Sequence, residues 1–532
     1  ANSLRSEPSR PGHATPKFGK TLLSMRPIFP AFLCLSLLFC AQQPPRAAPA
    51  PAKLPAKSSL RALIVSGGPT PSYNQYAIES NARYLEKLTA RAASQRILFA
   101  DGSKISRTIS ALEARPDARE RAVFAWIFET DDDSQRESQR AATLGRIDGP
   151  STRQSVVQQV QKLAGDSKPG SRALLYFTGH GSAGQKPRAA LFGPRTQDDY
   201  ENTTYALWNG DDFSTRDLGA ALANWPAQVP LVLVMVQCHA GGFANLVFQG
   251  GDPKNPVWNR DFCGFFASTG ERQASGCTSQ VDETDYQDFT THFFAALSGI
   301  SRGGQAVRGA DYDANGAVSL LEAFAWTNLQ DNSIDVPVCT SDAYLRSVFP
   351  QNSVENWQKV PYSQLLESAA PWQKAMLNGL SKVVGLSGEA RIEAALAAHS
   401  RVAARAQREE SVWPASVDRR ATENRVSALQ SALKAQFSGL NSPRRSPAFA
   451  KAKALALKWL AARPAEVEPL HRALKAWEAA QETDAAREAM LWRFVRAART
   501  VVLQKRLAVE GTAAQKATFA RLRASESRNP LL

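Results

Sequence analysis

Two short apolar runs in this chain each end at a polar residue that is bordered by glycine. The first, ALLYFTGHGSAG, starts at Ala173 and places His180 after its apolar residues; the second, PLVLVMVQCHAGGF, starts at Pro230 and places Cys238 there. Runs of this length that stop at glycine are typical of strands buried on both faces of a parallel sheet. Ligands of such sheets bind at the carboxyl ends of the strands. The pattern therefore predicts a fold that brings His180 and Cys238 to one sheet edge.

The same kind of pattern extends from Leu60 to about residue 330, where apolar runs alternate with amphipathic segments. Strands are predicted over residues 61–68, 96–103, 172–181, 229–238 and 261–270, with a further short strand over 122–128. Helices are predicted over residues 73–93, 151–165, 213–225 and 288–299. Such alternation predicts an α/β fold with a mostly parallel sheet covered on both faces.

The composition changes after about residue 355 and divides the chain into three parts. Strand-like runs vanish there, and Ala, Leu, Arg and Trp recur at helical spacing, which predicts an all-α C-terminal domain over residues 356–532. Residues 58–355 form the predicted α/β domain, and residues 1–57 precede it. Residues 401–532 carry 25 Lys and Arg against 12 Asp and Glu, whereas residues 61–400 carry 31 against 36. This asymmetry favours attraction within the chain, to an acidic partner or to a membrane surface, and the alternative is a solvated helical surface rich in Arg.

The N-terminal part has the layout of an export signal. Met25 and Arg26 precede an apolar stretch over residues 28–40, and a Pro/Ala-rich linker follows over residues 41–57. The stretch is too short to span a bilayer comfortably. It therefore predicts a secretory signal and an exported protein, whether periplasmic, held at the cell envelope or secreted. Cys40 at its end is a candidate for a lipid anchor to a membrane.

A thiol beside an imidazole has a specific chemical use. A thiol attacks a carbonyl carbon as the thiolate, and a neighbouring imidazole takes its proton. We therefore expect Cys238 to be a nucleophile and His180 its general base, with the N–H groups of Gly181 and Cys238 as an oxyanion hole. A buried Cys alone is commonly only a small apolar residue. The joint placement of the two residues after strands carries the prediction.

The motifs YFTGHGS and VQCHAGGF resemble the catalytic motifs of caspase-fold cysteine peptidases and, among these, of the legumain family. The resemblance covers roughly residues 60–330. It implies a caspase-like αβα sandwich and an endopeptidase that cleaves protein or peptide substrates without a required cofactor. The segment PSYNQY is similar to the family's Tyr-Asn segment, which implies that Asn74 orients the catalytic histidine.

The resemblance also implies a pocket for the substrate residue before the cut. FFASTGERQASGC and DETDYQDF are similar to the family's strand and specificity loop, which implies that Ser275 and Asp288 line this pocket. Tyr76 and Val236 stand where legumains that cut after asparagine carry Arg and Glu. The preferred substrate residue therefore stays open.

The segment DYDANGAVSLLE fits the spacing of a calcium-binding loop. Asp311, Asp313, Asn315 and Glu322 would supply oxygen ligands. The preceding segment is a poor helix, so a paired EF-hand is not expected. The alternative is a polar turn followed directly by a helix, with Ser319 and Glu322 forming the capping box at the start of that helix.

The six cysteines match no metal-binding pattern and are too sparse for a disulfide scaffold. Three remain besides Cys238 once the export signal is set aside: Cys263, Cys277 and Cys339. One disulfide, such as Cys277 with Cys339, would leave one of the three unpaired.

Three hypotheses for the function follow. The first is hydrolysis of peptide bonds through an acyl-enzyme. The second is a transpeptidase or ligase that passes the same acyl group to an amine, and the third is a peptidase-like scaffold whose basic helices bind an acidic partner. Legumains carry a helical prodomain over the active site, which implies that residues 365–532 dock on the α/β domain and keep a zymogen latent. Nucleic acid is not an expected partner, because the basic residues alternate with Ala and Leu and form no reading motif.

Overall fold

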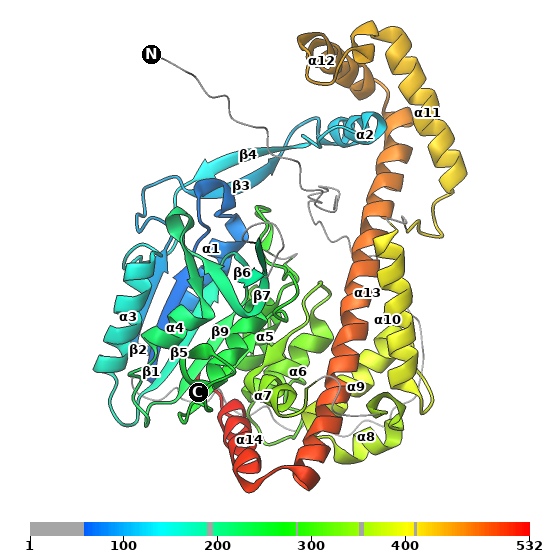
Figure 1. Ribbon diagram of the computed structural model, residues 1–532. Coiled ribbons are helices and arrows are strands. Elements are labelled where there is room, and N and C mark those ends of the chain that lie inside the picture. The colour runs from blue at the N-terminus through cyan, green and yellow to red at the C-terminus, as the bar shows by residue number, and fades with distance from the viewer. Residues whose placement is uncertain (1–57, 189–194, 284–285, 351–355, 409–411, 532) are drawn as a thin grey trace, which may run out of the picture.

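A six-stranded sheet forms the centre of the molecule (Figure 1). The computed structural model describes residues 58–188, 195–283, 286–350, 356–408 and 412–531. The strand order is β11-β10-β9-β5-β1-β2, and all neighbours are parallel except β10 and β11. The strands are β1 (Ser58–Ser66), β2 (Ala92–Phe99), β5 (Arg172–Thr178), β9 (Leu231–Met235), β10 (Phe262–Phe266) and β11 (Val338–Cys339). The predicted α/β fold with a mostly parallel sheet is therefore confirmed.

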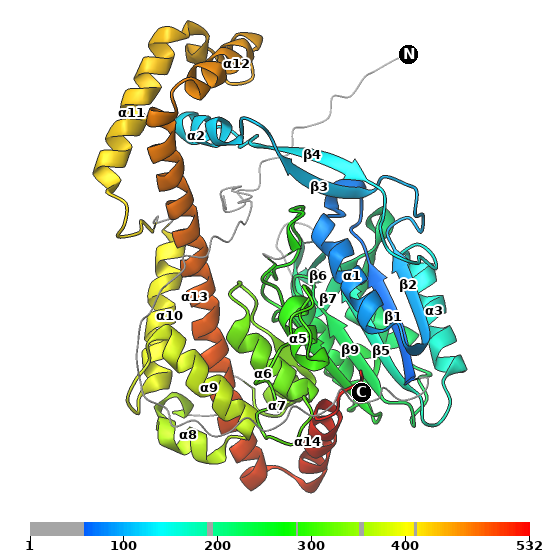
Figure 2. The same cartoon turned by 180° about the vertical axis from the view of Figure 1, so that it is seen from behind.

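Apolar residues that alternate along each strand give the sheet two apolar faces. In β1, Leu60 and Ile64 belong to one core cluster, and Leu63 and Val65 to the other. Figure 1 shows α3 and α4 in front of the sheet, and Figure 2, from behind, shows α1 and α5 over the opposite face. The covering helices are α1 (Tyr76–Leu88), α3 (Arg153–Asp166), α4 (Thr215–Ala221), α5 (Phe289–Ser298), α6 (Leu320–Gln330) and α7 (Thr340–Val348).

Two smaller antiparallel sheets were not predicted. One has the strand order β6-β7-β8 and consists of β6 (Gly181–Arg188), β7 (Arg195–Ala206) and β8 (Asp212–Ser214). The other pairs β3 (Ile109–Ala114) with β4 (Gln135–Arg140). Because β6 begins directly after His180, the first of these sheets stands beside the predicted site.

The prediction of a short strand over residues 122–128 was wrong, because this segment belongs to helix α2 (Ala118–Phe128). Its side chains Phe124 and Phe128 pack against Phe449 of helix α12 (Pro447–Ala461). A short apolar run cannot be assigned to strand or helix by periodicity alone. The deciding partner lies more than 300 residues further along the chain, where Gln430 also donates to the Ile127 carbonyl.

The C-terminal region is helical, as predicted. It consists of α8 (Tyr362–Ser368), α9 (Pro371–Val384), α10 (Arg391–Gln407), α11 (Arg419–Gln436), α12, α13 (Pro464–Glu510) and α14 (Ala513–Glu526). Helix α13 has 47 residues and is therefore about 70 Å long. Figure 1 shows that its upper end reaches α2 and its lower end passes the helices beside the sheet.

The helical region and the sheet share one hydrophobic core. Leu491 and Phe494 of α13 are buried in the same cluster as Phe265 of β10 and Phe293 of α5. At the chain end, Glu526 of α14 is buried and accepts hydrogen bonds from the first residues of α7. The helices are therefore packed as part of the α/β fold, and not as a separate layer resting on it.

Arg493 of α13 is fully buried and points into the α/β part. Its Nε donates to the carbonyl of Asp335 at 2.6 Å, and its Nη1 to the carbonyls of Asn328 and Asp331 at 3.2 and 2.5 Å. Its Nη2 donates to the carbonyl of Ser333 at 3.1 Å and lies 3.4 Å from the Asp331 carboxylate. A buried charge is tolerated only when paired and hydrogen-bonded in this way.

We expect Arg493→Ala to lower the free energy of unfolding by about 3–5 kcal/mol, because it leaves buried acceptors and a buried carboxylate without their donor. Arg472→Ala is the matched control on the same helix, since the Arg472 side chain is 73% exposed, and it should change the value by less than about 0.5 kcal/mol. Urea denaturation followed by circular dichroism measures both. Equal losses in the two variants would contradict the role given to Arg493.

Candidate active site

Strands β5 and β9 are neighbours and place His180 and Cys238 side by side. Their register pairs Phe177 with Met235. His180 lies three residues beyond Phe177 (177 to 180), and Cys238 lies three residues beyond Met235 (235 to 238). The two residues therefore follow neighbouring strands at one edge of the sheet.

The backbone of Gly181 touches the turn that carries the thiol. A Cβ at Gly181 would collide with the carbonyl oxygen of Cys238. Ala206 N–H donates to the His180 carbonyl at 2.9 Å, so these two residues form a hydrogen-bonded pair of the β6–β7 ladder. The next pair, Gly181 with Tyr205, is then non-hydrogen-bonded. The N–H of Gly181 therefore points away from β7, at the outer edge of the β6-β7-β8 sheet.

The His180 ring is held through Nε2. This atom lies 2.9 Å from the Tyr73 carbonyl and 2.7 Å from Oε1 of Gln75. A carbonyl can only accept, so Nε2 carries the hydrogen and Nδ1 keeps its lone pair. Burial lowers the pKa of His180, and the hydrogen bond to Tyr73 opposes this only in part. The imidazole is thus held neutral with a basic nitrogen available, as a general base requires.

Asn74, which was expected to orient the histidine, makes its hydrogen bonds elsewhere among the described residues. It is fully buried, its Oδ1 accepts from Gly68 N–H at 3.1 Å, and its Nδ2 lies 3.5 Å from Oγ1 of Thr108. Asn74 therefore holds the turn after β1, and its two chain neighbours Tyr73 and Gln75 contact the imidazole. The sequence could not identify Tyr73, because a backbone carbonyl leaves no residue signature.

The loop after β10 holds the Cys238 thiol. Ala274 N–H donates to Sγ at 3.3 Å. Burial raises the pKa of the Cys238 thiol, the hydrogen bond from Ala274 lowers it, and the nearby Asp335 raises it further. A hydrogen bond from the N–H of Cys238 itself also lowers the pKa of the thiol. The resting thiol is therefore protonated, and a base would have to take its proton before the sulfur could act as a nucleophile.

The residues after Cys238 form a tight turn against the same loop. His239 has a φ of 60°, its N–H donates to the Arg272 carbonyl at 2.8 Å, and its Nδ1 lies 2.7 Å from the Gly270 carbonyl. A Cβ at Gly241 would lie 2.7 Å from the Gly270 nitrogen. His239 is therefore a turn residue. Close packing of the backbone leaves no room for a side chain at Gly241.

Ser275 and Asp288, the residues expected to line the substrate pocket, both adjoin Gly276. A Cβ at Gly276 would lie 3.1 Å from Asp288 Oδ2. Asp288 is buried and caps α5, and it also accepts from Asn81 at 3.1 Å. Ser275 Oγ is buried without a partner among the described residues. Asp288 therefore packs against the loop at Gly276. The Ser275 hydroxyl remains able to donate or accept a hydrogen bond.

Asp335 is a site residue that sequence reasoning missed. It is fully buried, and its carboxylate accepts from Ser275 N–H at 2.6 Å and from Phe289 N–H at 3.2 Å. Burial raises the pKa of Asp335 well above its usual range, and the carboxylate of Asp331 raises it further. The signal in the sequence was an acid flanked by apolar residues in SIDVPV, which matches no motif.

The two positions that depart from the legumain pattern supply no charge to the site. The Tyr76 hydroxyl donates to Glu283 at 3.1 Å, and the guanidinium of Arg140 lies 4.5 Å from the Tyr76 ring centre. Val236 is buried in the hydrophobic core. Asp285, part of the acidic segment that precedes Asp288, lies outside the described residues.

The helical region also contacts the loop that holds the Cys238 thiol. Both Nη atoms of Arg272 donate to Glu488 of α13, at 3.0 and 2.6 Å, and His399 of α10 lies 2.6 Å from the same carboxylate. Burial raises the pKa of Glu488, but the hydrogen bonds from His399 and Arg272 outweigh it and bring the pKa to about 2. Since Arg272 also binds the backbone of His239, α13 is linked to the residue next to Cys238.

The predicted calcium loop is compact. One oxygen each of Asp311, Asp313 and Glu322 lie within 4.8 Å of one another. Asp311 accepts from the N–H groups of Asn315 and Gly316. Glu322 is buried and already accepts four hydrogen bonds, which fill its lone pairs.

The alternative interpretation of this segment is confirmed, because Ser319 and Glu322 form a capping box at the start of α6. A cation bound by Glu322 would have to displace some of these hydrogen bonds. The geometry therefore fits the capping box better, and calcium stays a prediction.

The proposed disulfide between Cys277 and Cys339 is wrong, because all four described cysteines are free thiols. The Sγ of Cys277 lies 3.3 Å from the Gly179 carbonyl. Cys339 is buried in β11, the edge strand of the six-stranded sheet. Its Sγ lies 3.5 Å from the Ser341 hydroxyl.

The export signal and Cys40 lie outside the described residues. None of the described helices is long and apolar enough to cross a membrane.

Comparisons with known proteins leave the family open. The chain matches no family model and no curated protein. Among solved structures it is similar to the crystal structure of protein GSU0716 from Geobacter sulfurreducens, with 13% identity and a TM-score of 0.29 over 53% of this chain and 92% of that chain. A similarity of this size carries no argument.

We expect Gly181→Ala to reduce the reaction of Cys238 with iodoacetamide at least tenfold, because the new Cβ forces the His180 strand and the Cys238 turn apart. Gly165→Ala in α3 is the control, since a Cβ there meets open space, and the alkylation rate should be unchanged. Mass spectrometry of the peptide that contains Cys238 measures both rates. A Gly181→Ala rate within twofold of the unaltered protein would contradict the packing argument.

Proposed function

We propose that this chain is a cysteine endopeptidase with a caspase-like αβα fold that resembles the legumain family. One observation carries the proposal: His180 and Cys238 each stand three residues beyond the paired positions Phe177 and Met235 of two adjacent parallel strands. The hydrogen bond from Nε2 of His180 to the Tyr73 carbonyl supports it, because it leaves Nδ1 as the base.

The proposed reaction proceeds through an acyl-enzyme. His180 Nδ1 takes the thiol proton as Cys238 Sγ attacks the scissile carbonyl carbon, and the carbonyl oxygen becomes an oxyanion. The N–H groups of Gly181 and Cys238 are the proposed donors to that oxyanion. The imidazolium then gives its proton to the leaving amine, and a thioester remains. A water molecule activated by His180 hydrolyses the thioester and restores the thiol.

In this proposal the helical region is a permanent part of the enzyme. Arg493 and Glu526 are fully buried in contacts with the α/β part, and Glu488 binds the loop beside Cys238 through Arg272. A prodomain that leaves on activation would expose these charged contacts. We therefore favour an integral helical support over a removable cover. Export by the N-terminal segment remains part of the proposal.

We expect Cys238→Ala and His180→Ala each to lower kcat/KM on a fluorogenic peptide library by about 10³-fold or more, because each removes a group that takes part in bond making. Cys277→Ala is the control, since it removes a half-buried thiol of the same neighbourhood and should change the value only severalfold. An unaltered chain without activity under reducing conditions, or an active Cys238→Ala variant, would contradict the proposal.

The pH profile gives an independent test. Because burial lowers the pKa of His180 below its ordinary value of 6.5, the imidazole stays neutral and basic at mildly acidic pH. We therefore expect the acid limb of kcat/KM to have its midpoint below pH 6.5. A midpoint above this value would mean that the base is a different group or that His180 is exposed in the working enzyme.

A further inference from the structure

A large aromatic side chain is exposed beside the candidate base. Tyr73 is 57% exposed, and its ring lies edge-on to the His180 imidazole, with the ring centres 5.7 Å apart and the planes at 90°. The backbone carbonyl of Tyr73 is the group that lies 2.9 Å from Nε2 of His180. Tyr73 therefore holds the imidazole through its backbone, while its ring is accessible to a bound molecule.

The turn that carries Tyr73 is rigid. Pro69 and Pro71 fix two of its φ angles. The N–H of Tyr73 donates to the Thr70 carbonyl at 3.0 Å, and the N–H of Asn74 donates to the Pro71 carbonyl at 3.2 Å. A ring on a rigid segment loses little conformational freedom when it binds a partner. The ring of Tyr73 is thus preorganised for contact.

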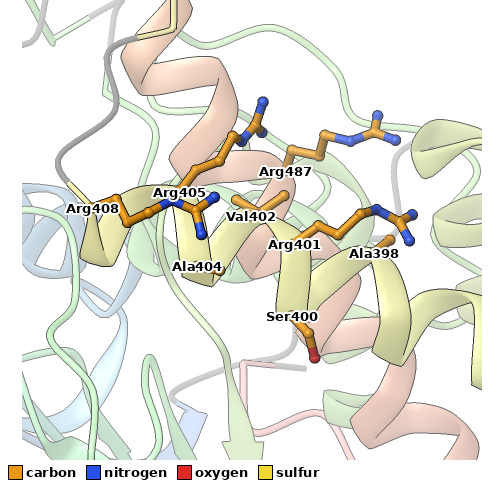
Figure 3. A pocket seen from close by; sticks show the side chains of 8 residues that line it. All are labelled: Ala398, Ser400, Arg401, Val402, Ala404, Arg405, Arg408 and Arg487. Atoms are coloured by element: carbon orange, nitrogen blue, oxygen red, sulfur yellow. The ribbon is translucent and has the colours of Figure 1, made fainter.

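The chain segment around Tyr73 is uncharged. Residues 67–76 contain no Asp, Glu, Lys or Arg. Arginines gather in a different part of the molecule, where Figure 3 shows them around a groove of about 610 Å³ between α10 and α13. The turn beside His180 therefore suits an apolar partner better than a charged one.

The next loop along the sheet edge also presents an apolar side chain. Strand β2 is the neighbour of β1, and the loop after β2 carries Ile105, which is 88% exposed. Lys104 and Arg107 of this loop donate to the backbone carbonyls of Gly145 and Gln139. The edge from His180 toward β2 thus offers two exposed apolar side chains on adjacent loops.

We propose that the Tyr73 ring binds the substrate side chain directly after the cut and selects an aromatic or large aliphatic residue there. The inference rests on the proposed peptidase reaction, in which the imidazolium of His180 gives its proton to the leaving amine. The amine nitrogen must then lie within hydrogen-bond distance of Nδ1. The side chain of the same substrate residue begins two bonds from that nitrogen, so a ring centred 5.7 Å from the imidazole is within its reach.

The test digests a mixture of peptides of varied sequence with the full chain under reducing conditions, and mass spectrometry identifies the residue after each cut. We expect aromatic and large aliphatic residues to be enriched there about fivefold or more over Ser and Gly. Tyr73→Ala keeps the carbonyl that holds His180 and should lower the enrichment to less than about twofold, whereas Tyr73→Phe should retain it. The enrichment compares residues within one digest, so a general loss of activity does not change it.

Tyr200→Ala is the matched control. Tyr200 is also an exposed tyrosine, and its ring stacks on His239, the residue after Cys238, with the ring centres 6.2 Å apart. Its loss should leave the enrichment after the cut within about twofold of the unaltered chain. Cleavage with the same enrichment in Tyr73→Ala, or an equal loss in Tyr200→Ala, would overturn the role of Tyr73 and leave the peptidase proposal standing. Failure of the unaltered chain to cleave any peptide would overturn both.

Discussion

The buried guanidinium of Arg493 is the interaction on which the arrangement of this molecule depends. It binds the backbone of the end of α6 and of the loop that follows, residues 328–335, at four points and lies beside the Asp331 carboxylate. That loop carries Asp335, whose carboxylate holds Ser275, one residue from the Ala274 N–H that binds the Cys238 thiol. A charge on the last long helix is therefore connected to the proposed nucleophile through direct contacts.

A second connection runs beside the first. Glu488 lies five residues before Arg493 on α13 and binds Arg272, whose carbonyl holds the turn after Cys238. The loop after β10 is thus held by α13 at two points, directly at Arg272 and at Ser275 through Asp335, which limits the positions that the thiol can take relative to the imidazole. Preorganisation of this kind depends on rigid supporting elements rather than on the strand ends alone.

The sequence predicted those parts of the fold and site that depend on local pattern. The apolar runs before His180 and Cys238 were sufficient to predict two parallel strands, and the helical C-terminal region followed from its composition. It could not predict that Tyr73 holds the imidazole instead of Asn74, since a carbonyl has no residue identity. It also did not predict the role of Asp335 or the helical state of α2. Both depend on contacts with residues far along the chain, Ser275 for Asp335 and Phe449 for α2. The prediction of a disulfide was wrong for a similar reason. Whether two cysteines pair depends on the distance between them in the fold, which their spacing in the sequence does not give.

The reach of α2 has a consequence for how the chain is made. Phe124 and Phe128 lie in a segment inserted between β2 and β5, yet their packing partner Phe449 is synthesised more than 300 residues later. Until then an apolar helix face remains open on the nascent chain, and such surfaces are prone to aggregation. Long sequence separation between contacts also slows folding. The apolar face of α2 therefore stays uncovered until the residues of α11 and α12 have been synthesised.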